Sequence, residues 1–152
     1  MEPYRIVLAD DHALVRQGVK RILEGRDDLW VVGEAGDGVE LLFLVNGLNP
    51  NMVILDISMP NLQGIQAARQ IKMKYPGMKI LIMTVHKERE YLYEAISAGV
   101  EGYLLKEEAE KELFSAIETL RAGKGFISPI ILQELGVRKK FMEEIFKFVL
   151  DK

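Results

Sequence analysis

Acidic, hydroxyl and basic side chains follow short apolar runs at four places along the chain, and their types suit phosphoryl transfer. Asp10 and Asp11 follow the first run, Asp56 follows the third, Thr84 ends the fourth and Lys106 follows the fifth. Carboxylates bind divalent cations such as Mg²⁺, which takes oxygen ligands and keeps part of its water shell. A carboxylate can also attack phosphorus, while ammonium and hydroxyl groups bind phosphoryl oxygens. The set predicts a magnesium-dependent phosphoryl-transfer site.

Five short β-branched or aliphatic runs predict the strands that would position these residues. They span residues 5–8, 30–33, 52–55, 79–83 and 102–105 and alternate little between polar and apolar side chains, which is typical of parallel strands covered on both faces. Segments with helical spacing of apolar residues lie between them. The pattern predicts a three-layer α/β fold with a central five-stranded parallel sheet and a ligand crevice at the carboxyl ends of the strands.

Asp10, Asp11 and Asp56 should therefore meet at one edge of the sheet. Three carboxylates within about 4 Å of one another would repel by roughly 4 kcal/mol per pair at an effective dielectric constant near 20. A divalent cation relieves this repulsion, and an all-oxygen set with room for water and phosphate suits Mg²⁺ or Mn²⁺. We expect Asp11 and Asp56 to hold the cation, Asp10 to act through water, and Asp56 to become an aspartyl phosphate.

The composition narrows the classes of protein that need to be considered. The chain has 152 residues, a net charge of −3 and no cysteine. This charge offers no general attraction for nucleic-acid phosphates, and the lack of thiols excludes disulfides and thiolate chemistry. No run of about 18 apolar residues predicts a membrane span, and the first residues do not resemble a signal peptide. We expect a cytoplasmic protein that does not bind membranes.

Five motifs together resemble the receiver domains of two-component response regulators, in particular the NarL/FixJ (LuxR-type) branch. They are ADDHALVR at residues 9–16, VGEAGDG at 32–38, LDISMP at 55–60, MTVH at 83–86 and GYLLK at 102–106. The resemblance covers residues 4–122 and implies a flavodoxin-like or CheY-like (βα)5 fold with strand order 2-1-3-4-5. It also implies a sensor histidine kinase as phosphoryl donor and a conformational switch that controls an output such as transcription. Such a domain signals and slowly dephosphorylates itself; it is not a turnover enzyme.

The resemblance implies a role for each residue that would touch the phosphoryl group or the metal. Asp56 is the phosphoacceptor, and Asp10 and Asp11 organise the metal together with it. The main-chain carbonyl of Ser58 is a further metal ligand. Lys106 is the cation that binds the phosphoryl group.

The resemblance also implies a switch and a means of setting the lifetime of the phosphoryl group. Thr84 moves towards the phosphoryl group and Tyr103 rotates inward, which reshapes the face formed by the fourth helix and fifth strand. Ser58 and His86 occupy the variable positions that tune phosphoryl lifetime. Glu107 stands where many receivers have a proline after a cis peptide bond, which leaves the geometry of that loop open.

Alternative interpretations remain open for the whole chain and for single residues. A phosphatase of the haloacid-dehalogenase kind also combines Asp, Thr, Lys and Mg²⁺, but its Asp-x-Asp motif follows the first strand. A flavodoxin-like electron carrier would share the fold, although acidic residues at the crevice argue against it. His12 adjoins the acidic pair, and we expect an exposed loop residue there in preference to a metal ligand or a phosphohistidine. Tyr103 could instead be an edge aromatic that only packs.

We assign residues 1–122 to the receiver and residues 123–152 to a linker with a C-terminal helical extension. This tail is too short for a helix-turn-helix unit, so DNA contact would need an output domain absent from this chain. From residue 139 onward one helical stripe is apolar, which predicts an amphipathic helix. The stripe consists of Phe141, Met142, Ile145, Phe146, Phe148 and Val149. It would either pack on the receiver or form a homodimer contact, and we favour the dimer.

Overall fold

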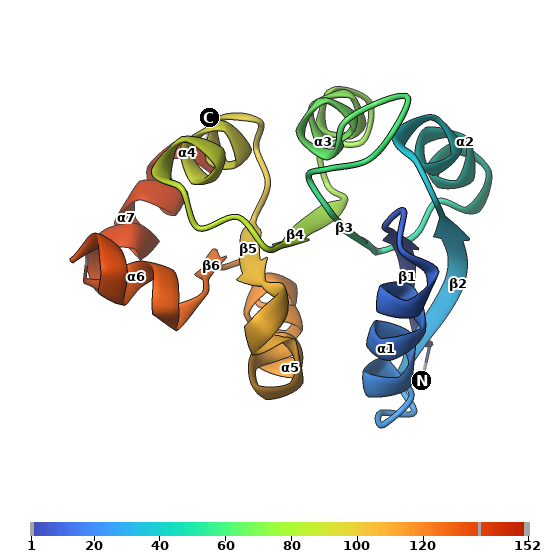
Figure 1. Cartoon of the computed structure of the whole chain (residues 1–152), viewed down its shortest axis with the longest axis horizontal. Coiled ribbons are helices and arrows are strands. Elements are labelled where there is room, and N and C mark those ends of the chain that lie inside the picture. Colours follow the sequence, from blue (N-terminus) through green and yellow to red (C-terminus); the bar gives the residue numbers. More distant parts are fainter. Residues whose placement is uncertain (1, 137, 151–152) are drawn as a thin grey trace.

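A computed structural model describes residues 2–136 and 138–150, in which strands and helices alternate through most of the chain (Figure 1). The strands are β1 (Tyr4–Ala9), β2 (Leu29–Ala35), β3 (Met52–Leu55), β4 (Lys79–Thr84), β5 (Gly102–Leu105) and β6 (Phe126–Ile127). The helices are α1 (Ala13–Leu23), α2 (Gly38–Leu48), α3 (Gly64–Lys74), α4 (Arg89–Ser97), the short 3-10 helix η1 (Lys106–Glu108), α5 (Ala109–Arg121), α6 (Pro129–Leu135) and α7 (Lys139–Leu150).

All six strands form one parallel sheet in the order β2-β1-β3-β4-β5-β6. The predicted order of the first five strands is confirmed, and β3 and β5 have the predicted bounds, while β1, β2 and β4 are slightly longer. The prediction of five strands is wrong, because β6 pairs with the outer side of β5. A strand of two residues is too short to show a pattern in the sequence. It is extended because it forms hydrogen bonds with β5.

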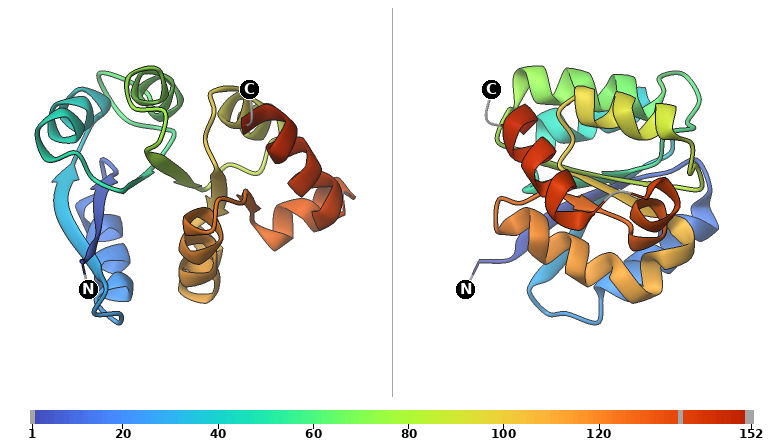
Figure 2. Two further views of the ribbon diagram at one scale, coloured as in Figure 1. Left: turned by 180° about the vertical axis from the view of Figure 1, so that it is seen from behind. Right: turned by 90° about the vertical axis from the view of Figure 1, so that its left-hand side faces the viewer.

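Helices cover both faces of the sheet, as Figure 1 and Figure 2 show: α1 and α5 on one face, α2, α3 and α4 on the other. Consecutive strand residues point to opposite faces, so Ile6 and Leu8 join the core beneath α1 and α5, while Val7 and Ala9 join the core beneath α2, α3 and α4. Both faces are therefore buried. This explains why the strands are apolar at nearly every position.

Gly64 lets α3 begin directly against the strand end that carries Asp56. Its amide donates a hydrogen bond to the carbonyl of Ile57 at 2.8 Å. A side chain at Gly64 would collide with the main-chain carbonyl of Asp56. This close approach requires glycine and holds the loop after β3 in place.

The chain after β6 packs against the β5 and α4 side of the domain (Figure 2). The predicted amphipathic helix is present as α7, which contacts α4. Phe146 is 2% exposed, and its ring lies so close to Gly125 that any side chain there would collide with it. Phe141 is 55% exposed and Ile145 is half-buried. The side chains of the remaining stripe residues, Met142, Phe148 and Val149, lie outside the described part of the structure.

We predict that Phe146→Ala lowers the free energy of unfolding by about 3 kcal/mol, because it removes a buried aromatic ring and leaves a cavity. Phe141→Ala is the matched control from the same helix, and its exposed ring should contribute less than about 0.5 kcal/mol. Urea denaturation of the full chain measures both. Equal losses for the two variants would contradict docking of α7 through Phe146.

Candidate functional site

The carboxyl ends of four strands bring the predicted site residues to one edge of the sheet. Asp10 follows β1 and Asp56 follows β3; the two residues are 4% and 5% exposed. Their strands are neighbours, and the Asp56 amide donates a hydrogen bond to the Ala9 carbonyl at 3.0 Å. Thr84 is the fully buried last residue of β4, and Lys106 follows β5. Strand pairing is therefore what makes these sequence-distant groups neighbours.

Lys106 joins the two buried carboxylates. Its Nζ lies 2.8 Å from Asp10 Oδ2 and 3.2 Å from Asp56 Oδ2. The second oxygen of Asp56, Oδ1, accepts a hydrogen bond from the Ile57 amide at 2.8 Å. Burial lowers the pKa of Lys106, but hydrogen bonding to Asp10 and the charges of Asp56 and Asp10 outweigh burial and raise this pKa. The ammonium group therefore stays charged at neutral pH.

The residues around Asp10 fit a hard divalent cation. Asp10 Oδ2 is buried, and among the described residues its close contact is the Lys106 ammonium, so it can still accept a ligand or water. Asp11 is exposed and lines an open depression of about 350 Å³ together with Ser58. Carboxylate and carbonyl oxygens beside open space are the donor set that Mg²⁺ prefers. The structure thus agrees with an oxygen-lined metal site at this place.

His12 is exposed, as predicted, and it also contacts the acidic pair. Its Nδ1 lies 3.0 Å from Asp11 Oδ1 and 3.2 Å from Asp10 Oδ1, and its amide donates to Asp10 Oδ1 at 2.9 Å. Among the described residues, the side-chain ligand atoms of Asp10, Asp11 and His12 lie within 4.8 Å of one another. Asp56 is not part of that group and instead contacts Lys106.

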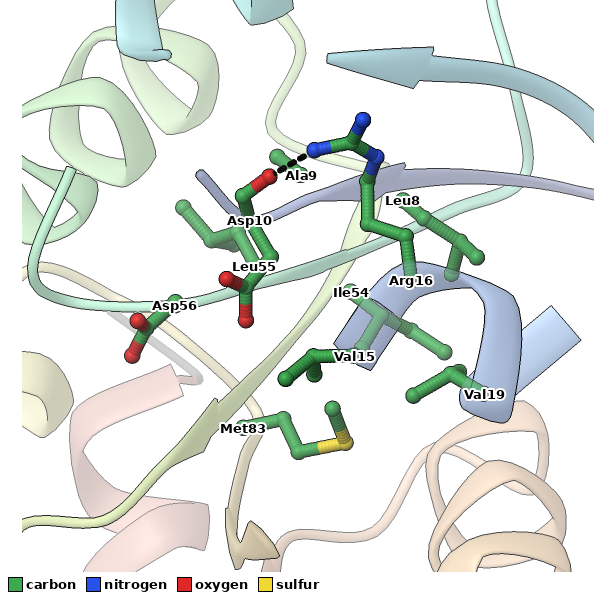
Figure 3. A pocket seen from close by; sticks show the side chains of 10 residues that line it. All are labelled: Leu8, Ala9, Asp10, Val15, Arg16, Val19, Ile54, Leu55, Asp56 and Met83. Atoms are coloured by element: carbon green, nitrogen blue, oxygen red, sulfur yellow. Dashed lines mark hydrogen bonds between the residues drawn. The ribbon is translucent and has the colours of Figure 1, made fainter. Parts of the chain in front are cut away.

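Arg16 is a part of the site for which sequence reasoning found no role. Figure 3 shows its guanidinium donating a hydrogen bond to the main-chain carbonyl of Asp10. Its Nε donates to Glu34 Oε1 of β2 at 3.3 Å. Long side chains on a helix point towards its amino terminus, so an arginine in the first turns of α1 reaches back to the preceding loop. That direction is the sequence signal that could have identified this support for Asp10.

His86 connects the predicted switch residues and the predicted lifetime residue. Its amide donates to Thr84 Oγ1 at 3.2 Å, and its carbonyl accepts from the Tyr103 hydroxyl at 2.9 Å. Its Nε2 lies 3.0 Å from Ser58 Oγ, and its ring stacks on Tyr91 with 4.3 Å between ring centroids. Tyr103 is fully buried and turned inward. Tyr103 is therefore not on an edge strand, because β6 lies outside β5, and its role in switching stays a prediction.

Residues 6–118 match the family model of the response regulator receiver domain, and the chain belongs to this family. Receiver domains of two-component systems are signalling domains that histidine kinases phosphorylate on aspartate. The phosphatase and flavodoxin interpretations are thereby set aside.

The similar proteins lie in the LuxR-type branch. The DegU transcriptional regulatory protein of Brevibacillus brevis is 36% identical over 131 residues, which are 86% of this chain and 56% of that protein. The NreC oxygen regulatory protein of Staphylococcus carnosus is 41% identical over 126 residues, covering 82% and 58%. The chain thus spans little more than half the length of these curated relatives.

Solved structures show the same similarity. A LuxR-family two-component response regulator from Aurantimonas superposes with a TM-score of 0.84 at 38% identity, covering 89% of this chain and 96% of that one. The receiver domain of NarL from Mycobacterium tuberculosis gives a TM-score of 0.77 at 34% identity, covering 82% and 100%. The predicted NarL/LuxR resemblance is confirmed. Within the described residues, none of the helices has the length and apolar character needed to cross a membrane.

We predict that Tyr103 makes the protein less stable at alkaline pH. Burial raises the pKa of its phenol above the value near 10 of an unfolded chain, so the unfolded chain releases this proton first. The free energy of unfolding should fall as the pH rises above about 10. Tyr103→Phe lacks this proton, and its deficit relative to the parent should shrink between pH 8 and pH 11 in urea denaturation.

Tyr93→Phe is the control for this measurement, because the Tyr93 ring is exposed. The difference between this control and the parent should stay the same at both pH values. A constant deficit for Tyr103→Phe would contradict the prediction.

Proposed function

We propose that Asp56 accepts the phosphoryl group in this receiver domain and that the donor is a phosphohistidine of a sensor histidine kinase. The observation that carries the proposal is the buried Asp56 carboxylate, held between the Ile57 amide and the Lys106 ammonium at the carboxyl end of the sheet. Both contacts fix the carboxylate before the reaction begins. A fixed nucleophile lowers the entropic part of the barrier.

The chain's own residues account for positioning and charge in this reaction. A carboxylate oxygen of Asp56 forms the bond to phosphorus while the bond to the donor imidazole breaks and the imidazole keeps the electron pair. Lys106 lies beside Asp56 Oδ2 and would bind a phosphoryl oxygen as a point charge. Asp10, Asp11, Asp56 and the Ser58 carbonyl would hold Mg²⁺ or Mn²⁺, and a bound cation supplies further neutralisation of the phosphoryl charge.

We predict that incubation with Mg²⁺ and acetyl phosphate adds one phosphoryl group to the parent protein and none to Asp56→Asn. The amide is a poor nucleophile and cannot form the acyl phosphate. Asp27→Asn is the matched control, because Asp27 is an exposed aspartate in the loop before β2. Intact-mass spectrometry measures the adduct, and EDTA should abolish it in the parent. An undiminished adduct in Asp56→Asn would refute the assignment.

Thr84, Tyr103 and His86 form the proposed switch. The Thr84 hydroxyl is buried at the end of β4 and accepts a hydrogen bond from the loop amide of His86, so its own proton could be donated to a phosphoryl oxygen. The carbonyl of His86 holds the Tyr103 hydroxyl. A movement of Thr84 would therefore shift His86, which bonds Tyr103 and stacks on Tyr91 of α4.

We predict that Thr84→Ala still accepts the phosphoryl group, because nucleophile and metal ligands remain, but no longer transmits it. Amide hydrogen exchange across residues 88–106 should change on phosphorylation in the parent and much less in the variant. Thr119→Ala, which removes a hydroxyl that donates to the Ser115 carbonyl within α5, should respond like the parent. An equal change in Thr84→Ala would exclude the switch role.

Ser58 and His86 are the proposed determinants of phosphoryl lifetime, and the domain is proposed to dephosphorylate itself slowly without turning over substrates. Ser58 Oγ, in the loop after β3, lies 3.0 Å from His86 Nε2, in the loop after β4. Stacking on Tyr91 restricts the His86 ring. Ser58 follows Asp56 by two residues, and His86 follows the neighbouring strand β4, so both lie at the edge of the sheet where water would reach Asp56.

The proposed partners are a sensor histidine kinase in the cytoplasm and an output domain that contacts DNA. The relatives described as transcriptional regulatory proteins support transcription as the output. We also propose a homodimer, and among the described side chains of the stripe the exposed ring of Phe141 supports it. Phe146 is buried within its own chain, so α7 packs on its own receiver, and among the described side chains of the stripe Phe141 is an exposed ring that a second copy could cover.

We predict that the full chain self-associates at high micromolar concentration and that Phe141→Glu is monomeric, because a charge cannot be buried there without a partner. Phe43→Glu on α2 is the control, since Phe43 is equally an exposed aromatic but far from α7 in the chain. Sedimentation velocity measures the masses. Monomeric parent protein would rule out the dimer.

A further inference from the structure

The loop that carries Lys106 is held by a residue outside the part of the chain that matches the family. Residues 6–118 match the receiver model, whereas β6 and Ser128 follow α5. Ser128 is fully buried. It contacts β5 twice, once on each side of Leu104: its amide donates to the Tyr103 carbonyl at 2.9 Å, and its Oγ accepts from the Leu105 amide at 2.7 Å.

Where β6 ends, the hydroxyl of Ser128 takes the place of a main-chain carbonyl as hydrogen-bond acceptor for β5. The amide of Phe126 donates to the Glu101 carbonyl, and the amide of Ser128 donates to the Tyr103 carbonyl. Every second residue of β5 therefore turns its main-chain groups towards β6, and Leu105 is the next residue in this series. Pro129 then begins α6 and turns the chain away from the sheet. The Leu105 amide, one residue before Lys106, would have no strand partner without the serine hydroxyl.

Two further contacts tie the same segment to the loop after β5. Glu108 is buried, and its Oε1 accepts from the Ile130 amide in the first turn of α6 at 3.4 Å. Lys87, in the loop after β4, lies 3.0 Å from Glu107 Oε1 and 3.9 Å from Glu134 Oε1 of α6. Residues on both sides of Lys106 are thus bonded to the segment from β6 to α6.

We propose that Ser128 is a positioning residue for Lys106: its hydroxyl fixes the end of β5 so that the ammonium group is placed beside Asp56. The proposal rests on the function proposed above for Lys106. It also extends the working receiver to at least α6, beyond the boundary at residue 122 expected from sequence. A small displacement of a charged group can cost a large factor in rate, because the reacting geometry is tight.

The test is a double-mutant cycle on the rate of phosphorylation by acetyl phosphate at saturating Mg²⁺. Lys106→Ala should slow the reaction by roughly a hundredfold, since it removes a preorganised charge. Ser128→Ala should slow it by about tenfold, through displacement of Lys106. In the Lys106→Ala background, Ser128→Ala should change the rate by no more than about twofold, because the group on which it acts is gone.

A purely structural role would not produce this coupling. Ser128→Ala would then lower thermal stability in both backgrounds without a rate effect that depends on Lys106. Thr119→Val, which removes a hydroxyl from α5, is the matched control and should leave the rate unchanged.

The outcomes separate the two proposals. If Ser128→Ala reacts at the parental rate, or slows the reaction equally with and without Lys106, the positioning role is overturned while the proposed function stands. If the parent is not phosphorylated, or Lys106→Ala is as fast as the parent, the proposed function itself fails. If Ser128→Ala does not fold, the isosteric pair Ser128→Thr and Ser128→Val replaces it, and equal rates for that pair overturn the role of the hydroxyl.

Discussion

The contact of one ammonium group with two buried carboxylates is the constraint around which this domain is arranged. Asp10 and Asp56 are almost fully buried, and either charge alone would be costly to remove from water. Lys106 compensates both, at 2.8 and 3.2 Å. The three residues follow β1, β3 and β5, so the charge cluster forms only when these strands are correctly ordered. The charge cluster is therefore a property of the folded domain and not of any single segment.

Three other parts of the chain hold the loops that carry this cluster. Arg16 holds the Asp10 main chain from α1, and Gly64 lets α3 press against the Asp56 carbonyl. Ser128 holds the end of β5 from the segment after α5. Each of these three supports acts on main-chain atoms and not on the carboxylate oxygens of Asp10 and Asp56. Preorganisation of this kind is what a phosphoryl-transfer site needs, because little of its catalysis is covalent.

The outer edge of β5 is covered by the chain's own continuation. A parallel strand at the end of a sheet exposes unpaired amide and carbonyl groups. Here β6 satisfies several of them, and α7 packs Phe146 into the hollow over Gly125. Tyr103 and α4, which belong to the proposed switch, lie on the same side of the domain. The C-terminal segment therefore contacts this side, through α7 on α4 and through Ser128 on the Tyr103 carbonyl.

The sequence by itself determined the α/β fold through its local apolar runs and the receiver family through its motifs at the strand ends, and the resemblance to that family implied the order of five strands. It also identified Asp10, Asp56 and Lys106, since carboxyl ends of parallel strands share one edge. Tertiary structure alone decided the sixth strand, the contact of Arg16 with Asp10, the central place of His86 and the bond from Ser128 to Leu105. Each of these depends on pairs of groups far apart in the chain, and a short segment such as β6 has no preference strong enough to reveal its conformation. Its neighbour in space, the outer edge of β5, supplies the hydrogen bonds that make it a strand.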